Sequence, residues 1–577
     1  MKKVTLLCTR ASREVTLDAL RDLGAVHLQH VTSPEGEGLE QARRHFEYLR
    51  RVLEVLPKHP DKAPSGKSAH DVVENVWKLI HRKQALIEKI ELLEIESRRY
   101  EPFGQFDVDD ILALREQGLQ IKLLHAPIKQ LPDLPEDATL VELDRDRTSA
   151  YFVLISREPV EIDAEELPLP ECSVAGMIRH IEGLQKELAE VEEGFSEYIG
   201  DHDAVAAIAG EAEDHVAWLE ARNGMGKEEE VCYLRGFFPA ERENELRAAA
   251  EKQGWAVLVE DPSEDDPVPT LLRNAKWVRT IKPLLDMVNL TPGYHETDIS
   301  PAFLVFFCVF FGMLVGDAGY GLIFLAATTF FRIRLKKAPR AVFNLLTVTS
   351  VATITWGAIT GVWFGISNPP QILEAMHLTW LDDYYHVMGL CFLIGAVHLT
   401  LAHGWQALNK RKTPQMLAEI GWIGSTWAMY FIAADMIAGW TMPALTLPLL
   451  AASIGLIVLF MTPPSELKKE WIGHAMLPLD VINNFVDVVS YLRLFAVGLA
   501  TLEVAKAFNG MASGAGWIGA AIILFLGHTM NIAMAVMGVM VHGLRLNALE
   551  FSNHVGLEWA GSKYNPFARI KNKGGQQ

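Results

Sequence analysis

Charged and polar side chains interrupt a segment that is otherwise apolar enough to lie in a lipid bilayer. This segment, residues 477–511, contains Arg493. A guanidinium near the bilayer centre costs at least ~2.5 kcal/mol on insertion scales, so such an arginine indicates a functional site. At about 100° per residue, Arg493 shares an arc of about 120° with Asn483, Asp487 and Ser490. The polar set of the segment is completed by Asp480 and Asn484.

Two interpretations of this stripe remain open: a structural ion pair inside a helix bundle, or a path for ions past a fixed positive charge. The next apolar segment, residues 515–555, favours the path, because it also carries one arginine on a polar stripe. Ala535 and Gly538 lie on that stripe, and small residues let a neighbouring helix approach closely. The stripe spans about 100° of arc and contains His528, Asn531, His542 and Arg545.

The apolar runs predict an α-helical membrane domain of eight spans over residues 281–577. Basic clusters separate the runs, and the positive-inside rule places these clusters in the cytoplasm. Each interval between clusters then needs an even number of crossings. The first run must be a tight hairpin of two short spans, with Asp317 at its glycine-rich break. The runs are 299–331, 341–366, 385–408, 417–440, 445–461, 477–511 and 515–555, and the clusters are 332–340, 410–412, 468–469 and 569–573.

This topology assigns the polar groups to the two sides of the membrane. The helix with Arg493 starts in the cytoplasm, so its acidic half is the inner one, and the last helix runs back. Arg493 and Arg545 then lie between two offset half-channels, and arginine does not lose its charge in proteins. His542 is one turn from Arg545 and is placed to orient it or to relay protons. The outer half contains His528, Asn531 and Glu503, with Asp435 or Glu419 as further candidates, and Asn547 and Glu550 lie near the cytoplasm.

Charge divides the chain at about residue 280. Residues 281–577 carry 18 basic and 16 acidic side chains, whereas residues 1–280 carry 35 and 56. This acidity argues against a nucleic acid partner. The five cysteines lack paired spacing, so no disulfide framework or zinc site is indicated. The first residues carry charge too early for a signal peptide, which indicates a cytoplasmic start.

Residues 1–280 predict a cytoplasmic antiparallel coiled-coil arm with two small α/β lobes. Strand–helix–strand patterns at both ends, within 1–35 and 228–262, predict one lobe. Apolar residues alternate at spacings of three and four over helices 68–100 and 173–222, which is typical of a coiled-coil seam, with an ordinary helical bundle as the alternative. The segment 105–160 between these helices predicts the second, distal lobe. The fold is therefore mainly α, and no Walker loop, catalytic triad, metal cluster or cofactor motif is evident in this half.

The stretches SYLRLFAVGLA (490–500) and HGLRLNALEF (542–551) resemble the last two membrane helices of the stator membrane subunit of rotary V/A-type ATPases, called subunit a or subunit I. The break GDAGYG (316–321) resembles the first membrane hairpin of that family. The resemblance implies an ion-translocating subunit that has no catalytic site, metal or cofactor of its own. It also implies a multi-pass protein of a prokaryotic plasma or inner membrane, with both termini cytoplasmic.

In the family that the chain resembles, ions are carried by a rotating proteolipid c-ring, each subunit of which has a membrane carboxylate. The resemblance further implies that the arm binds peripheral-stalk E/G-type coiled coils and the central-stalk cap subunit, while lipid surrounds the membrane half. It leaves H⁺ and Na⁺ open as the coupling ion. The alternative is a self-contained secondary transporter with a coiled-coil regulatory arm. A transporter would need its own substrate pocket and inverted repeats.

Overall fold

The computed structural model of the 577-residue chain describes residues 1–59, 62–127, 138–146, 148–160, 164–335, 338–366, 370–373, 375–463 and 471–569. The predicted basic cluster 468–469 lies outside the described residues, as do parts of the clusters 332–340 and 569–573. The chain forms two compact units, Met1–Asp261 with Pro566–Gln577, and Pro262–Asn565.

A five-stranded antiparallel sheet joins the two ends of the first unit. β8 lies between β2 and β1, so the two strand–helix–strand segments interleave in one sheet as a split βαβ arrangement. Alternate residues such as Leu6 and Leu234 point into the core below the helices α1 and α7. The elements are β1 (Lys2–Thr9), α1 (Arg13–Leu23), β2 (His27–Gln29), β7 (Gly226–Glu228), β8 (Val231–Phe238), α7 (Glu243–Gln253) and β9 (Ala256–Glu260).

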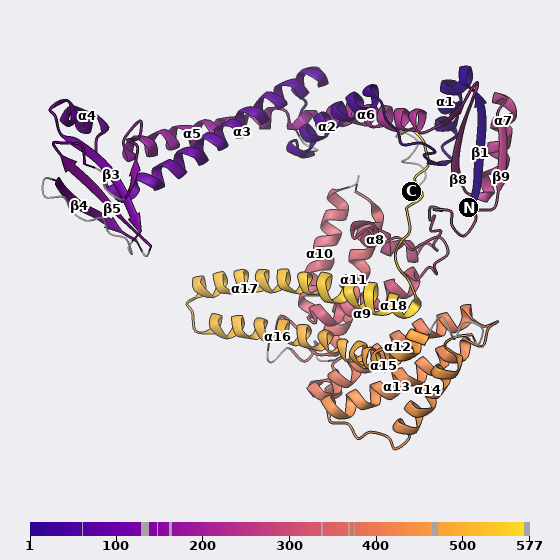
Figure 1. Ribbon diagram of the computed structural model, residues 1–577. Coiled ribbons are helices and arrows are strands. Elements are labelled where there is room, and N and C mark those ends of the chain that lie inside the picture. The colour runs from indigo at the N-terminus through magenta and orange to yellow at the C-terminus, as the bar shows by residue number, and fades with distance from the viewer. Residues whose placement is uncertain are drawn as a thin grey trace. The chain divides into compact units, whose positions relative to one another are not determined.

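Paired helices connect this sheet to a second one (Figure 1). α3 packs against α5 through Leu86, Ile90 and Leu184, and its first turns pack against α2 and α6. The second sheet has the strand order β4-β5-β3-β6. The elements are α2 (Glu37–Val55), α3 (Ala69–Tyr100), α4 (Val108–Glu116), β3 (Gln120–Pro127), β4 (Ala138–Arg145), β5 (Ser149–Ser156), β6 (Glu165–Leu167), α5 (Val174–Gly194) and α6 (His202–Asn223).

The structure differs from the sequence-based expectation at two places in these helices. The helix expected over 173–222 is divided by the 3₁₀ turns Phe195–Glu197 and Ile199–Asp201. Phe195 and Tyr198 turn into the core there, so side-chain burial interrupts the helix although the apolar spacing continues. Helix α2, which had no expected element, pairs with α6 and buries only Leu39, Leu49 and Val52.

The second unit is helical. Within the described residues, four helical stretches are long and apolar enough to cross a membrane: Arg340–Ile359, Tyr384–Asn409, Trp471–Ser513 and Trp517–Val555. Ser300–Val315 and Thr446–Phe460 are shorter apolar helices, and the eight spans stay a prediction. The elements are α8 (Lys282–Met287), α9 (Ser300–Val315), α10 (Ala318–Arg334), α11 (Arg340–Ile359), α12 (Tyr384–Asn409), α13 (Met416–Ala438), α14 (Thr446–Phe460), α15 (Trp471–Ser490), α16 (Leu492–Ser513), α17 (Trp517–Gly538) and α18 (Ser552–Val555).

Asp317 holds the break between α9 and α10. Its carboxylate caps α10 by accepting the backbone N–H groups of Gly319 and Tyr320, at 2.7 and 3.3 Å. It also accepts the N–H groups of Phe364 and Gly365, at 2.9 and 3.1 Å, both of which have a positive φ. Helix α11 packs against both α9 and α10 beside this point. One buried carboxylate therefore fixes the two-residue turn and the loop after α11 together.

We expect Asp317→Ala to destabilise the protein by ~3 kcal/mol or more, because an unsatisfied buried N–H costs roughly 1–3 kcal/mol and four lose their acceptor. Thermal unfolding of the purified protein in detergent measures the loss as a lower midpoint temperature. Asp435→Ala is the matched control, since Asp435 is exposed and accepts one N–H group, that of Met442. Equal midpoints for the two variants would contradict the role given to Asp317.

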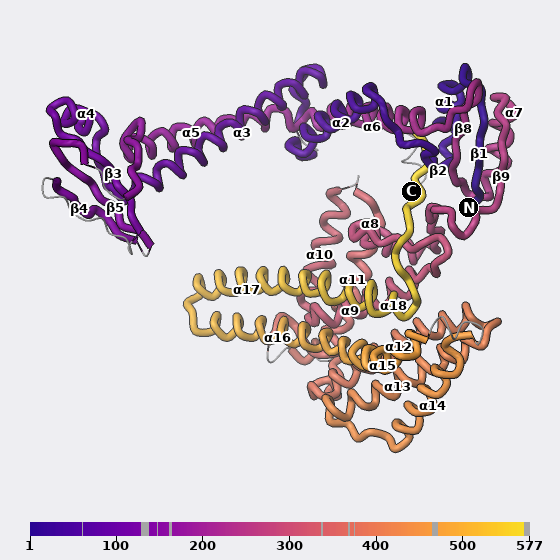
Figure 2. The backbone as a smooth tube through the Cα atoms, in the orientation of Figure 1, coloured from indigo at the N-terminus to yellow at the C-terminus, as the bar shows by residue number. Residues whose placement is uncertain are grey.

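Both C-terminal segments depart from a regular α-helix near their arginines. The segment expected over 477–511 turns at Tyr491, between α15 and α16. The segment expected over 515–555 contains two π-helical stretches, Val539–Gly543 and Leu546–Phe551, on either side of Arg545. Figure 2 shows α16 and α17 running side by side, in agreement with their packing. π-Helical insertions occur often at functional sites.

Candidate functional site

Two arginines and one glutamate meet between the two C-terminal segments. Arg493 donates from Nη2 to Glu550 Oε1 at 2.5 Å, and from Nε to the carbonyl of Ser490 at 2.8 Å. Arg545 Nε lies 3.4 Å from the same Glu550 oxygen. The Glu550 side chain is only 6 % exposed, and its Oε2 has no hydrogen-bond partner among the described residues. The cluster thus holds two fixed cations against one buried carboxylate, with one acceptor unused.

Local packing explains how Arg493 reaches this cluster. Tyr491 is fully buried, and its hydroxyl is 2.8 Å from Nδ1 of His398 on α12. A Cβ at Gly395 would clash with the Tyr491 ring, so this glycine allows the ring to pack directly against the backbone of α12. Tyr491 therefore pins the turn between α15 and α16, and Arg493 follows it by two residues. The wider turns of the π-helical stretches position Arg545 and Glu550 opposite.

Both arginines stand at the ends of exposed stripes. The side chains of Arg545 and Arg493 are 56 % and 25 % exposed. The stripe that ends at Arg545 is apolar, and the stripe that begins at Arg493 is rich in alanine. Their exposed residues, at helical spacings of three and four, are Met530, Met534, Met537 and Val541 on one segment and Ala496, Ala500, Glu503 and Ala507 on the other.

The polar residues of α15, which were expected on the inner side, do not all face the same way. Ser490 donates from Oγ to the carbonyl of Asp487 at 2.6 Å, next to the Arg493 bond. Asn484 is buried instead against α13, where it bonds to Ser425 and Thr426. Asn483 is exposed and Asp480 is half-buried on α15. The structure therefore separates Asn484 from the stripe with Arg493.

Two histidines that the sequence analysis did not single out lie in line with Asp487. His554 Nε2 lies 2.9 Å from Asp487 Oδ2, and His554 Nδ1 lies 2.9 Å from His403 Nε2. His403 in turn contacts Glu419, which was expected on the outer side. One sequence signal was available, because His554 follows Glu550 by four residues and shares its helical face.

The polar residues expected on the outer side converge on Tyr320 at the start of α10. Its hydroxyl lies 2.6 Å from His528 Nδ1 and accepts a hydrogen bond from Asn531 Nδ2 at 3.0 Å. His528 Nε2 also contacts Asn509 of α16. Asn531 Nδ2 donates to the carbonyl of Thr501 on α16. The polar stripe of α17 is therefore turned toward α10 and α16, whereas the free face of α17 is the apolar one.

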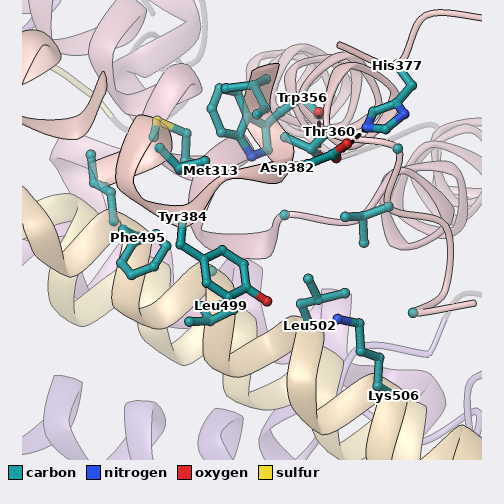
Figure 3. A pocket seen from close by; sticks show the side chains of 18 of the residues that line it. Met313, Trp356, Thr360, His377, Asp382, Tyr384, Phe495, Leu499, Leu502 and Lys506 are labelled. Atoms are coloured by element: carbon teal, nitrogen blue, oxygen red, sulfur yellow. Dashed lines mark hydrogen bonds and ion pairs between the residues drawn. The ribbon is translucent and has the colours of Figure 1, made fainter. Parts of the chain in front are cut away.

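A pocket of about 340 Å³ lies beside α16, between that helix and the loop that follows α11 (Figure 3). Its wall on α16 runs from Leu494, next to Arg493, to Lys506. Lys506 pairs with Glu503 at 2.8 Å, and Glu503 itself does not line the pocket. The opposite wall carries the His377–Asp382 pair, with a separation of 2.8 Å. The pocket thus brings Lys506, His377 and Asp382 together on the side of α16 that leads away from Arg493.

Two further candidates, His542 and Asp435, lie outside these hydrogen-bonded groups. His542 is half-buried and makes no side-chain hydrogen bond within the described residues. Asp435 is exposed at the end of α13. No three His, Cys, Asp or Glu side chains converge as a metal site in the part of the chain that the structure describes.

Comparison with known proteins gives relatives along the whole chain. The chain is 30% identical to V-type ATP synthase subunit I 1 of Treponema pallidum (strain Nichols), over 98% of this chain and 99% of that protein. It is 29% identical to V-type ATP synthase subunit I of Borreliella burgdorferi, over 99% of each. A-type ATP synthase subunit I of Methanocaldococcus jannaschii is 25% identical over 60% of this chain and 56% of its own length.

A search of solved structures finds the crystal structure of the cytoplasmic N-terminal domain of subunit I, a homologue of subunit a of V-ATPase. It covers 45% of this chain and 100% of that chain at 15% identity, with a TM-score of 0.23, which is too low to support an argument. No family model matches the chain. The full-length sequence match decides the question: the chain belongs to the subunit I family of V-type ATP synthases.

Proposed function

We propose that this chain is the stator subunit that lets ions cross the membrane against a rotating proteolipid ring, through two half-channels separated by Arg493 and Arg545. The observation that carries this proposal is the shared carboxylate of Glu550, which both arginines contact at the ends of two exposed stripes. The cluster has a net positive charge, and one side of it is open. It is therefore suited to receive a carboxylate from a second protein.

The ring carboxylate would travel through lipid in its neutral form, because a bare charge there costs several kcal/mol. The apolar and alanine-rich stripes offer the ring a surface, and the small side chains of the second stripe let a ring helix approach closely. At the cluster, the arginines stabilise the ionised form, so the carboxylate releases its ion. Because the arginines remain charged, they also oppose a direct leak of cations between the half-channels.

The surrounding polar groups supply the two half-channels. Asp480, Asn483, Asp487 and Ser490 belong to the inner one. The pocket along α16, together with Tyr320, His528 and Asn531, supports the outer one. His542, one turn from Arg545, adjusts the position of that arginine. In this arrangement an ion enters and leaves at different positions and must ride the ring between them.

Co-purification tests the proposal most directly. The protein, extracted from its native membrane in mild detergent, is expected to bring a small proteolipid ring and a soluble ATPase head. The reconstituted complex should couple ATP hydrolysis to ion uptake. A chain that purifies alone and transports a solute without ATP would instead be a self-contained transporter, and the proposal would fail.

We further propose that the helices of the first unit form a coiled-coil arm that binds the peripheral-stalk coiled coils and the central-stalk cap. Leu184 is buried against Leu86 and Ile90, so Leu184→Asp with Leu188→Asp places unpaired charge in the α3–α5 seam. We expect electron microscopy of this variant to show lost stalk density while the membrane half remains inserted. Ile178→Asp, at an exposed position of α5, is the control. Equal stalk occupancy in both variants would refute the arm's role.

A further inference from the structure

Five side chains form an unbroken hydrogen-bonded line beside the arginine cluster. Lys410 Nζ lies 2.7 Å from Glu419 Oε1, and Glu419 Oε2 lies 2.9 Å from His403 Nδ1. His403 Nε2 lies 2.9 Å from His554 Nδ1, and His554 Nε2 lies 2.9 Å from Asp487 Oδ2. The line crosses α12, α13, α18 and α15, whose sequence positions are up to 151 residues apart.

The middle of the line is buried, and its two ends are more exposed. The side chains of His403, Glu419 and His554 are 7, 11 and 14 % exposed, whereas those of Asp487 and Lys410 are 29 and 39 % exposed. Lys410 directly follows α12, in the turn that the basic residues 410–412 assign to the cytoplasmic side. Asp487 lies two turns before Arg493. The line therefore joins a water-exposed turn to the neighbourhood of the arginine cluster.

The three central contacts of the line need one more proton than two neutral histidines supply. Three contacts, Glu419–His403, His403–His554 and His554–Asp487, each need one proton to be hydrogen bonds. A neutral imidazole has one N–H, and an ionised carboxylate has none. Two neutral histidines therefore fill two contacts, and the third needs a proton on a carboxylate or on a histidine. The geometry is satisfied only when an excess proton is present somewhere along the line.

We propose that these side chains are a proton relay that leads into the inner half-channel at Asp487, and that the coupling ion is H⁺ rather than Na⁺; this inference rests on the proposed function above. Protonated Glu419 gives its proton to His403 Nδ1. His403 Nε2 releases its proton to His554 Nδ1, and His554 Nε2 releases its proton to Asp487. One proton enters and one leaves, three bonds to hydrogen break and three form. Both rings end in the opposite tautomer, and reorientation of the two rings resets them before the next proton enters.

The same geometry disfavours sodium. Hard cations are held by several converging oxygen atoms, whereas here the ring nitrogens stand in line and hydrogen-bond to one another. The Lys410 ammonium compensates the charge of Glu419 after its proton has left, which a relay needs and a cation site does not. The ring of Trp422 stacks beside His403, with centroids 6.0 Å apart, and covers the middle of the line.

The test compares His403→Gln and His554→Gln in the whole complex, reconstituted in liposomes, with ATP-driven H⁺ uptake followed by a pH-sensitive dye. Glutamine keeps a hydrogen-bonding side chain but does not relay a proton. A positioned proton-transfer group contributes ~10²–10⁴-fold, so we expect uptake to fall at least ~10-fold in each variant. His474→Gln is the matched control, since His474 lies on α15 outside the line.

Chemical rescue separates relay from packing. In His554→Ala and His403→Ala, millimolar imidazole is expected to restore part of the uptake, and it should leave His474→Ala unchanged. Glutamine variants as fast as the control, or losses in assembled alanine variants that imidazole leaves unchanged, would overturn the relay. So would radioactive Na⁺ uptake without H⁺ uptake by the unsubstituted complex, which needs no variant to fold. Na⁺ uptake would overturn the relay but leave the proposed stator function intact. A chain that does not couple to a ring at all would overturn both the relay and the stator function.

Discussion

Replacement of Arg493 by lysine is expected to abolish most coupled ion transport while the complex still assembles. The guanidinium points two nitrogens in different directions, toward Glu550 and toward the Ser490 carbonyl. Lysine presents one ammonium group on a flexible stem and can lose its proton when buried. It therefore cannot hold both contacts and present a permanent charge to the ring carboxylate. ATP-driven uptake in liposomes, with a pH-sensitive dye and with radioactive sodium, measures the loss.

Arg340→Lys is the control for this substitution, since Arg340 is an exposed residue at the start of α11. ATP hydrolysis by the detached soluble head should be the same in both variants, which shows that the loss lies in the membrane half. Arg493→Ala should also stop coupled transport and additionally permit a passive leak. Wild-type uptake of either ion by Arg493→Lys would rule out the fixed-charge mechanism.

Glu550→Gln is the second substitution for which we expect a large effect. It removes the only negative charge that both arginines contact among the described residues. Two cations then face the incoming ring carboxylate, which binds more tightly and leaves more slowly. Breaking a buried pair by removing one partner costs ~3–5 kcal/mol. If ~1.4 kcal/mol of this appears as tighter binding of the ring carboxylate, its release slows tenfold. We expect ion uptake and ATP hydrolysis by the coupled complex to fall together, at least ~10-fold.

A compensating substitution makes this prediction specific. Arg545→Gln in the Glu550→Gln background returns the net charge of the cluster to one positive charge, as in the unsubstituted protein. The double variant should therefore transport faster than Glu550→Gln alone. Arg493 is kept, and Arg545 is the more exposed of the two arginines. If the two substitutions simply add their losses, the charge balance of the cluster does not control release. Glu558→Gln, at an exposed position after α18, is the matched control.

Several features were predictable because they depend on local sequence. A glycine-rich break with an aspartate is visible without a structure, and Asp317 indeed caps α10 at that break. The apolar runs with single arginines also identified the two segments whose side chains meet at Glu550. The family assignment followed from the same stretches, and full-length relatives confirm it. The two charged segments followed from helical spacing and the high cost of charge in lipid, whereas the family assignment rested on the resemblance of these stretches to known relatives.

Tertiary packing decided the rest, because a helical wheel shows which residues share a face but not which neighbour covers it. Asn484 lies beside Asn483 in sequence, yet it is turned into α13, and the polar stripe of α17 is covered by α16. The same limit hid the contact between His403 and His554, because their helices are far apart in the chain and meet only when α12 and α18 pack together. The sequence determined which helices carry charge in the membrane, whereas only the packed bundle determined which charges touch.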